Sequence, residues 1–581
     1  MAQAPSRRSL LAAGVLGSAS LAGGGTASAD VARAAGPDRA GELSFPSPEL
    51  TPFVDPLPVL PTSSGDSTLA TAAARHRFHR DLGIAPTWSY GGLPYLGPTV
   101  EAHRDHPIAL TFANGLGRHL FAADIDPSLE GASEQDRVRP RASVHLHGAV
   151  TPPGMDGHPE QTFTPGGAMT YRHPNGQEAA HLWYHDHAMG ITRLNVVAGL
   201  AGSYLLRDSF DTGTAANPLG LPSGEFEIPL ILADRRFHSD GSLNFRTLRS
   251  VPQGRWDGGM IGDRMTVNGT VSPYLRVAGG HYRFRILNAS NLRAYQLYFG
   301  NRMPFWVIGT DGGLLDAPVR TASVRLSPAE RVDVVADFSG LAAGAHVDLT
   351  NDQELAPSVR AVTGARPLPY VMRFIGTGGP GHRTAPPARL RGGTHQPARL
   401  PDWPAPTRRR VVSIAQMRGT RRPPSMMLDN LHYDDSPILM PKQGTVELWE
   451  IVNASFQDHP MHLHLAGARI VNRQPFDLKN FLRGNPRPRP GTFWAPDPDP
   501  FLRGTPQAPQ AWEAGLKDTV RCPWGMVTRM LVRFPSADEL GFDPDAAFAA
   551  QDGRSLRGYV WHCHILDHED DCMMARYRLT T

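Results

Sequence analysis

The chain has 581 residues, too many for one hydrophobic core, so we expect three or four domains. Its hydrophobic content of 40% and charged content of 19% are ordinary for a soluble globular protein. The net charge of +3 gives no indication of a nucleic acid or an anionic membrane as partner. The 59 glycines and 54 prolines indicate many turns, which favours an all-β fold.

The N-terminus resembles an export signal. Ser6-Arg-Arg-Ser-Leu-Leu11 is similar to a twin-arginine motif, a short apolar stretch follows it, and Ala27-Ser-Ala29 is a candidate cleavage site. The apolar stretch is too short for a membrane anchor, and no later segment resembles a membrane span. Residues 1–29 therefore predict a twin-arginine signal peptide and a secreted or cell-envelope location.

The rest of the chain divides by composition. Residues 30–66 are rich in Ala, Gly, Pro and Ser and predict a flexible N-terminal arm. Short β-like runs separated by turn residues fill 67–208 and 225–375, which we interpret as two domains of one style. Residues 376–407 have the composition of a linker, and 408–581 form the last predicted domain.

An internal echo supports a repeated fold. The stretch Arg283-Phe-Arg-Ile-Leu-Asn-Ala-Ser290 resembles Glu447-Leu-Trp-Glu-Ile-Val-Asn-Ala-Ser455, so a strand that ends in Asn-Ala-Ser is expected twice. Such strands favour Greek-key sandwiches or barrels.

Histidines with metal-ligand spacing gather in four short clusters. Ten of the 24 histidines lie there: His145, His147, His185, His187, His459, His462, His464, His562, His564 and His568. One His-x-His pair alone would indicate only two strand histidines, but this repetition predicts metal sites.

The last cluster lies in Tyr559-Val-Trp-His-Cys-His-Ile-Leu-Asp-His568, on a β-like run. Side chains at i and i+2 of a strand share a face, so His562 and His564 point one way and Cys563 points the other. The spacing therefore predicts two metal sites on opposite sides of one strand, joined through Cys563.

The site on the cysteine side has a recognisable ligand set. His568 and Met573 follow Cys563 closely enough for a loop to return them, and His459 is free to supply a second imidazole. One thiolate, two imidazoles and a weak thioether are the ligands of a blue-copper centre. Zinc is the main rival, but structural zinc sites are rich in cysteine and four-coordinate, and one zinc ion would leave most of these histidines unused.

The clusters and their flanks resemble the multicopper oxidases, in patches from about residue 90 to the end. The similarity is greatest to the branch of bacterial spore-coat laccase, bilirubin oxidase and phenoxazinone synthase. Four stretches support it besides the last cluster: Gly97-Pro-Thr-Val-Glu101, His147-Gly-Ala-Val-Thr-Pro152, Asp156-Gly-His-Pro159 and Trp183-Tyr-His-Asp-His-Ala-Met-Gly190.

The resemblance implies three cupredoxin-like domains and four coppers per chain. It also implies that the first and last domains touch, because histidines of residues 67–208 and 408–581 share the three-copper site. By position it assigns one type 1 copper to His459, Cys563, His568 and axial Met573. It assigns the type 2 copper to His145 and His462, and the two type 3 coppers to His147, His185, His187, His464, His562 and His564.

Acids near the ligands are candidates for proton transfer. Reduction of dioxygen to water consumes protons, and related enzymes have acids at the positions of Glu569 and Asp156, which we interpret as proton donors. Asp186, between two ligands, is expected to point away into a structural hydrogen bond. Three further acids, Asp567, Asp570 and Asp571, are expected to be polar loop residues or a rim for substrate.

Three cysteines do not make a disulfide framework. With Cys563 assigned to copper, Cys522 and Cys572 remain, as free thiols or as a pair; free thiols are favoured.

The sequence therefore predicts an exported oxidase. It would take single electrons from a small reducing substrate, a phenol or aminophenol by resemblance, and reduce O2 to water. Bilirubin-type tetrapyrroles, Mn(II) and Cu(I) are alternative donors. A non-catalytic copper carrier is a less favoured alternative, because a carrier needs the Cys563 site but not eight further histidines. The sequence does not predict the oligomeric state.

Overall fold

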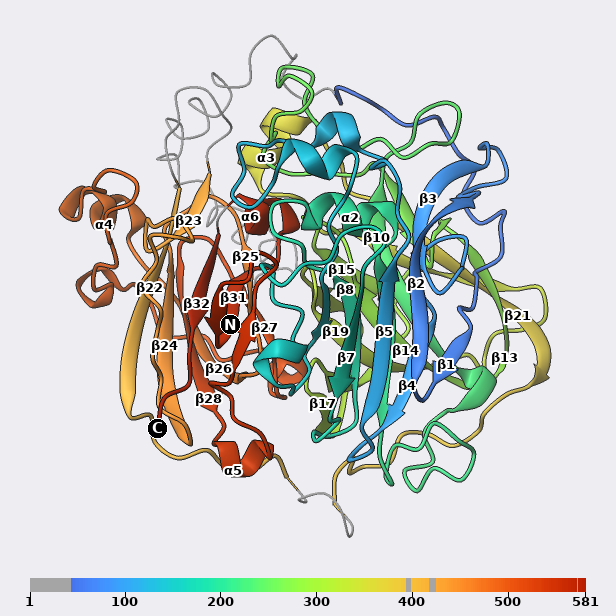
Figure 1. Cartoon of the computed structure of the whole chain (residues 1–581). Coiled ribbons are helices and arrows are strands. Elements are labelled where there is room, and N and C mark those ends of the chain that lie inside the picture. The colour runs from blue at the N-terminus through green and yellow to red at the C-terminus, as the bar shows by residue number, and fades with distance from the viewer. Residues whose placement is uncertain (1–42, 393–398, 417–424, 572) are drawn as a thin grey trace, which may run out of the picture.

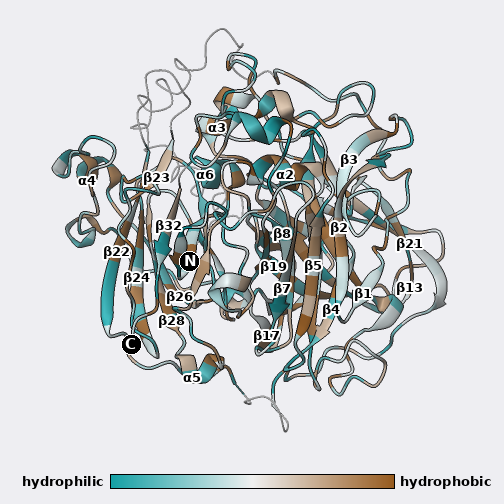
Figure 2. Ribbon diagram, in the orientation of Figure 1, coloured by the Kyte–Doolittle hydropathy of each residue, from teal (hydrophilic) through white to brown (hydrophobic). Residues whose placement is uncertain are grey.

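The computed structural model describes residues 43–392, 399–416, 425–571 and 573–581. The predicted signal peptide, the start of the arm and Cys572 lie outside these residues. β-Strands dominate the described chain and helices are short, which confirms the all-β prediction. The strands lie in three pairs of sheets (Figure 1), and apolar residues concentrate on them while polar residues concentrate on loops (Figure 2).

The first two sheets come from residues 62–207. One has the order β1 (Thr62–Ser64), β4 (Thr99–His103), β9 (Ala201–Arg207), β8 (Ala180–Asp186) and β6 (Val144–His147). The other has the order β3 (Ala85–Tyr90), β2 (Ser67–His76), β5 (Ile108–Asn114) and β7 (Ala168–His173).

The middle sheets come from residues 227–380. One has the order β12 (Thr270–Val271), β11 (Arg264–Val267), β10 (Glu227–Arg235), β14 (His281–Asn288), β19 (Arg331–Asp337), β16 (Phe305–Thr310) and β17 (Gly313–Thr321). The other has the order β13 (Tyr274–Gly279), β21 (Tyr370–Pro380), β20 (His346–Asn351), β15 (Tyr295–Phe299) and β18 (Val324–Leu326). β21 thus continues into the stretch that was expected to be linker.

The last sheets come from residues 408–577. One has the order β23 (Met426–Leu428), β22 (Arg408–Gln416), β24 (Thr445–Asn453), β28 (Met526–Phe534) and β26 (Gly467–Pro475). The other has the order β27 (Thr519–Cys522), β25 (His459–Leu463), β31 (Tyr559–Cys563) and β32 (Met574–Tyr577), and a hairpin of β29 (Ala547–Ala549) and β30 (Ser555–Arg557) lies apart.

Helices occupy connections between strands. The α-helices are α2 (Thr192–Ala198), α3 (Pro357–Thr363), α4 (Leu478–Gly484), α5 (Ala537–Leu540) and α6 (Leu566–Asp570). The 3-10 turns are η1 (Ala122–Asp124), η2 (Glu134–Arg137), η3 (Pro153–Met155), η4 (Gly224–Phe226), η5 (Asp499–Phe501) and η6 (Ala511–Glu513).

The three pairs of sheets share one topological device. Each pair contains parallel neighbours, β2 with β5, β10 with β14 and β22 with β24, in otherwise mostly antiparallel sheets. Parallel neighbours need a connection that leaves the sheet, which is how Greek-key folds pass between layers. The expected echo is present: β14 ends at Asn288 and β24 ends at Asn453, and each amide oxygen accepts the backbone N–H two residues on.

The described part of the arm lies along the protein surface. The Ser47 backbone N–H donates to Asp263 at 2.7 Å, and the Leu57 N–H donates to the Tyr274 carbonyl at 2.7 Å. β1 then adds a parallel strand beside β4. We call residues 62–207, 227–380 and 408–577, each with its pair of sheets, the first, middle and last segments. These bonds attach residues 47–64 to the middle and first segments.

The first and last segments meet at α2 and α6, which lie side by side (Figure 1). The buried Asp570 carboxylate accepts the backbone N–H groups of Thr192 and Arg193 at 3.1 and 2.9 Å, and it lies 3.2 Å from the Arg193 guanidinium. These bonds satisfy two of the N–H groups that a helix start leaves unpaired. We call this contact the Arg193–Asp570 clamp.

The expectation that Asp567, Asp570 and Asp571 are polar loop residues or a substrate rim was wrong. All three side chains are buried. Asp567 accepts the Met260 N–H at 3.1 Å and an N–H of Asn291 at 3.2 Å, so it ties α6 to the middle segment. A run of acids is usually solvated, but here the cation and donors that compensate for burial come from distant parts of the chain.

Replacing Arg193 with Met should lower the free energy of unfolding by about 3–5 kcal/mol, because it leaves buried carboxylates without their cation. Urea denaturation, monitored by tryptophan fluorescence, measures the free energy of unfolding for the first unfolding transition. The double variant Arg193→Met, Asp570→Asn should lose less free energy of unfolding than the single variant, because the Asp570 carboxylate no longer carries an uncompensated charge. Equal losses in both would contradict the clamp.

Candidate metal centres

Four neighbouring strands place the histidines. In β6 and β8, His145 lies opposite His185, and in β25 and β31, His462 lies opposite His562. Because strand side chains alternate, each His-x-His pair presents both rings on one face. Eight buried histidines therefore converge between the first and last segments: His145, His147, His185, His187, His462, His464, His562 and His564. We call them the imidazole cluster, and they confirm the expected contact between these segments.

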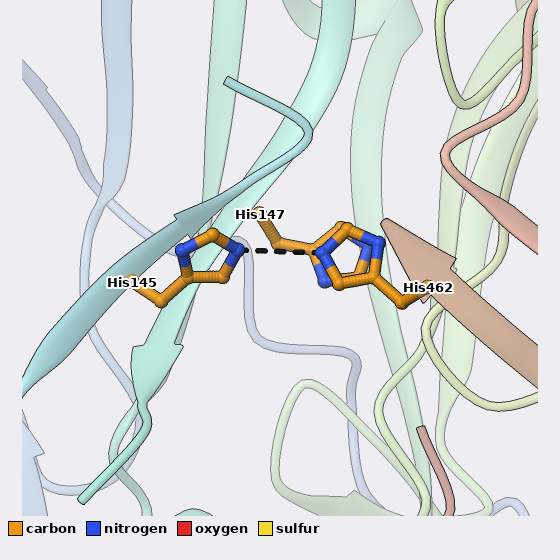
Figure 3. Close-up of side chains that lie close together, drawn as sticks. All are labelled: His145, His147 and His462. Carbon is orange, nitrogen blue, oxygen red and sulfur yellow. Dashed lines mark hydrogen bonds between the residues drawn. The ribbon is translucent and has the colours of Figure 1, made fainter. Parts of the chain in front are cut away.

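The cluster contains three groups of three histidines, two of which share His147. Within each group the ligand atoms lie within 4.8 Å of one another. The groups are His145, His147 and His462; His147, His185 and His564; and His187, His464 and His562. In the first group the Nε2 atoms of His145 and His462 are 3.4 Å apart, and the rings of His147 and His462 stack with centroids 3.5 Å apart (Figure 3).

The donor atoms fit a bound metal. His147 Nδ1 and the Nε2 atoms of His185, His187 and His564 are buried and make no hydrogen bond within the part of the chain that the structure describes. A buried polar atom without a partner destabilises the folded state, so these nitrogen lone pairs are expected to coordinate a ligand. Burial lowers the pKa of His145, His147, His462, His464 and His564 well below the ordinary value, which keeps the imidazoles neutral for coordination.

Acids hold the outer nitrogens of these rings. Asp156 Oδ2 lies 2.6 Å from His464 Nδ1, and the Asp156 carbonyl oxygen lies 2.6 Å from His145 Nδ1. The two oxygens of Glu569 lie 3.0 and 3.1 Å from the Nδ1 atoms of His187 and His562. Such contacts fix the tautomer and orientation of a ligand ring.

The two acids differ in acidity. Burial raises the pKa of Asp156 to about 8, with a smaller opposing effect from His187. Burial acts in the same direction on Glu569, but the neighbouring His562 and His187 outweigh it and hold the pKa of Glu569 well below its usual range. Asp186 points away, as expected, and accepts the Ala188 N–H and an Asn195 N–H.

A second group lies on the opposite face of β31. Cys563 Sγ is 3.4 Å from His459 Nδ1 and 3.8 Å from His568 Nδ1, and all three residues are buried. We call these three residues the thiolate cluster. Met573 is fully buried in the same apolar core, and its backbone bonds to both Cys563 and His568. The prediction that Cys563 and its neighbours serve opposite faces is confirmed.

Several contacts were not predicted from the sequence. Asp518 Oδ1 lies 2.9 Å from His147 Nε2, and its carbonyl oxygen lies 3.0 Å from His462 Nδ1. The outer Nε2 atoms of His459 and His568 bond to Ser455 and Gln457, both at 2.9 Å. In the sequence, Ser455 and Gln457 are indicated only by their closeness to His459. Asp518 is indicated only by its place just before β27, the strand that pairs with β25. Cys522 is a buried free thiol.

Comparisons with known proteins agree with this geometry. Multicopper oxidase family models match residues 135–210, 242–347 and 401–580. A laccase of Bacillus subtilis is 34% identical over 91% of this chain and 99% of its own length. The chain belongs to the multicopper oxidase family.

This multicopper oxidase is also 33% identical to a multicopper oxidase of Arabidopsis thaliana, over 92% of this chain and 94% of that protein. A solved laccase-like multicopper oxidase from the lignin-degrading Ochrobactrum sp. superposes with a TM-score of 0.67, at 25% identity, over 90% of this chain and 100% of the other. The laccase relatives support the bacterial laccase branch. The protein is a copper oxidoreductase that uses O2, and its cofactor is copper at type 1, type 2 and type 3 sites.

Asp518→Asn should weaken copper binding by about 10–100-fold, because the carboxylate orients His147 from behind. Copper retained after dialysis against a graded chelator series measures the effect. Glu539→Gln is the matched control, since Glu539 lines the same surface cavity of about 450 Å³ but pairs with Arg533. If both variants retain copper equally, Asp518 does not orient the ligand.

Proposed function

We propose that this multicopper oxidase is an exported laccase-like enzyme that oxidises phenols or aminophenols by single electrons. The observation that carries the proposal is the position of Cys563, which belongs to the thiolate cluster while its chain neighbours His562 and His564 belong to the imidazole cluster. Electrons that enter the thiolate cluster thus have a short covalent route along β31 to the site of oxygen reduction.

The proposed ligands follow the clusters. The type 1 copper takes His459, Cys563, His568 and Met573, and the type 2 copper takes His145 and His462. The two type 3 coppers take His147, His185 and His564, and His187, His464 and His562. Bound copper supplies one-electron transfer and the reduction of O2 to two waters. The protein holds the rings, excludes water and supplies protons.

Substrate is proposed to enter beside His568. A cavity of about 70 Å³, the His568 cavity, is lined by that ring, by Gln457 and by apolar side chains that include Leu292 and Val359, with one carboxylate, Asp257. Apolar walls with one acceptor suit a phenol or an aminophenol. The middle segment contributes part of this wall and so shapes the entrance.

Proton supply is proposed for Glu569 and Asp156. Each carboxylate contacts a ring nitrogen of the imidazole cluster and is nearly inaccessible to water. Burial raises the pKa of Asp156, whereas in Glu569 the effect of burial is outweighed by His562 and His187, which lower it, so the two acids differ in how readily they release a proton.

The alternatives concern the electron donor and the location. Bilirubin, Mn(II) or Cu(I) would use the same clusters, and a copper carrier would use the thiolate cluster alone. Export by a twin-arginine signal stays a prediction from residues 1–29. Among the described residues, no helix is long and apolar enough to cross a membrane.

Cys563→Ser should abolish the blue colour and reduce substrate oxidation to background, because it removes the thiolate and the electron route together. Absorption spectroscopy and O2 consumption measure the two effects. Elemental analysis of the unsubstituted protein should give about four coppers per chain. Oxidation retained by the variant, or about one copper per chain, would overturn the proposal.

Glu569→Gln should lower kcat by about 10²–10⁴-fold, because the amide keeps the shape but cannot relay a proton. Anaerobic reduction of the blue centre by the same phenol is the control, since it needs no proton for oxygen chemistry and should keep its rate. Equal losses in both rates would show that Glu569 supports ligand geometry and does not supply protons.

A further inference from the structure

A second cavity lies near the thiolate cluster, with Gln457 and Ile565 between the two. It has a volume of about 460 Å³ and is much larger than the His568 cavity. The two cavities share Leu292, Val359 and Gln457 in their walls. Pro460 and Ile565 also line the second cavity. The Ile565 N–H donates to Cys563 Sγ at 3.4 Å, and the Gln457 side chain bonds to His568 Nε2 at 2.9 Å. Two wall residues of the second cavity therefore contact the thiolate cluster, although none of the three cluster residues lines it.

This second cavity is lined by arginines, and we call it the arginine cavity. Arg325, Arg360 and Arg521 face two carboxylates, Asp458 and Glu354. Asp458 is shared between Arg325 at 2.8 Å and Arg521 at 3.4 Å, while Arg360 pairs with Glu354 at 2.7 Å. The cavity therefore has one more guanidinium than carboxylate.

The arginines also keep unused donors. The Nε atoms of Arg325 and Arg360 are buried and make no hydrogen bond within the described chain. Burial and the nearby Arg521 lower the pKa of Arg325, which is the effect expected where positive charge is undercompensated. Both side chains are partly exposed, at 29% for Arg325 and 39% for Arg360, so their terminal N–H groups can bind an anion with two oxygens, since a guanidinium binds carboxylates through paired N–H groups.

An aromatic surface completes the cavity. Trp524 lines it with 48% of the residue exposed, which is unusual for so large an apolar ring. Its backbone N–H donates to Asp458 at 3.2 Å, so the indole is held beside the arginine pair. A flat ring bound here can stack on the indole while its anionic group faces the guanidinium groups.

We propose that the arginine cavity binds aromatic carboxylates and positions phenolic acids as electron donors. The carboxylate pairs with Arg325, the ring stacks on Trp524, and the phenol end points toward Gln457. The phenol would lose one electron to the copper that the thiolate cluster holds when loaded, and one proton to solvent. This inference rests on the proposed oxidase function and adds the substrate class to it.

The binding step is tested without turnover. Calorimetric titration with 4-methoxybenzoate, which lacks a phenolic group, should show tighter binding to the holoenzyme than its methyl ester shows. Arg325→Gln should weaken binding of the carboxylate about tenfold and leave the ester unchanged, because one charge-assisted pair is lost. Trp524→Ala should weaken both ligands. Arg408→Gln, an exposed arginine on β22, should change neither.

The kinetic arm compares syringate with methyl syringate. Arg325→Gln should raise KM for the acid about tenfold and leave kcat and the ester's KM unchanged. Equal binding of carboxylate and ester by the unsubstituted protein, or equal weakening of both by Arg325→Gln, would overturn the inference. If the unsubstituted protein oxidises neither phenol, the proposed function fails instead, and the calorimetric comparison still decides the cavity.

Discussion

Alternation of side chains along β31 is the constraint on which the metal centres depend. A strand sends consecutive residues to opposite faces, so His562 and His564 cannot share a site with Cys563. The face with the histidines must be completed from β6, β8 and β25, and the other face from β25 and α6. The contact between the first and last segments follows from this requirement, and the clamp at α2 and α6 lies at that contact.

Burial sets the second requirement. Buried imidazoles need partners for the nitrogens that do not coordinate, and Asp156, Glu569 and Asp518 lie against the outer nitrogens of His464, His187 and His147. All three carboxylates hold rings in place. Asp156 and Glu569 have the additional proposed role of carrying protons. A change at either acid affects geometry and chemistry together, which is why copper content and turnover must be measured separately.

The sequence predicted the parts of the site that depend on local spacing. The shared face of each His-x-His pair and the opposite face of Cys563 follow from a period of two residues within a single strand. The grouping of the histidines into sites came from the family resemblance, and the strand that ends in Asn-Ala-Ser came from a sequence echo. Asp518 and Gln457 were not predicted, because their roles arise only when β27 pairs with β25 and when α6 brings His568 to Gln457. Asp570 was misassigned for the same reason: its partner, Arg193, is distant in sequence.

The two clusters differ in how much of the chain they need. The thiolate cluster takes all three of its residues from 459–568, although α6, which carries His568, is also held by Arg193 and by Met260. The imidazole cluster exists only after residues 145–187 and 462–564 have packed together, a contact of very long sequence separation. A change that loosens this contact would therefore disperse the imidazole cluster while the residues of the thiolate cluster stay within one segment.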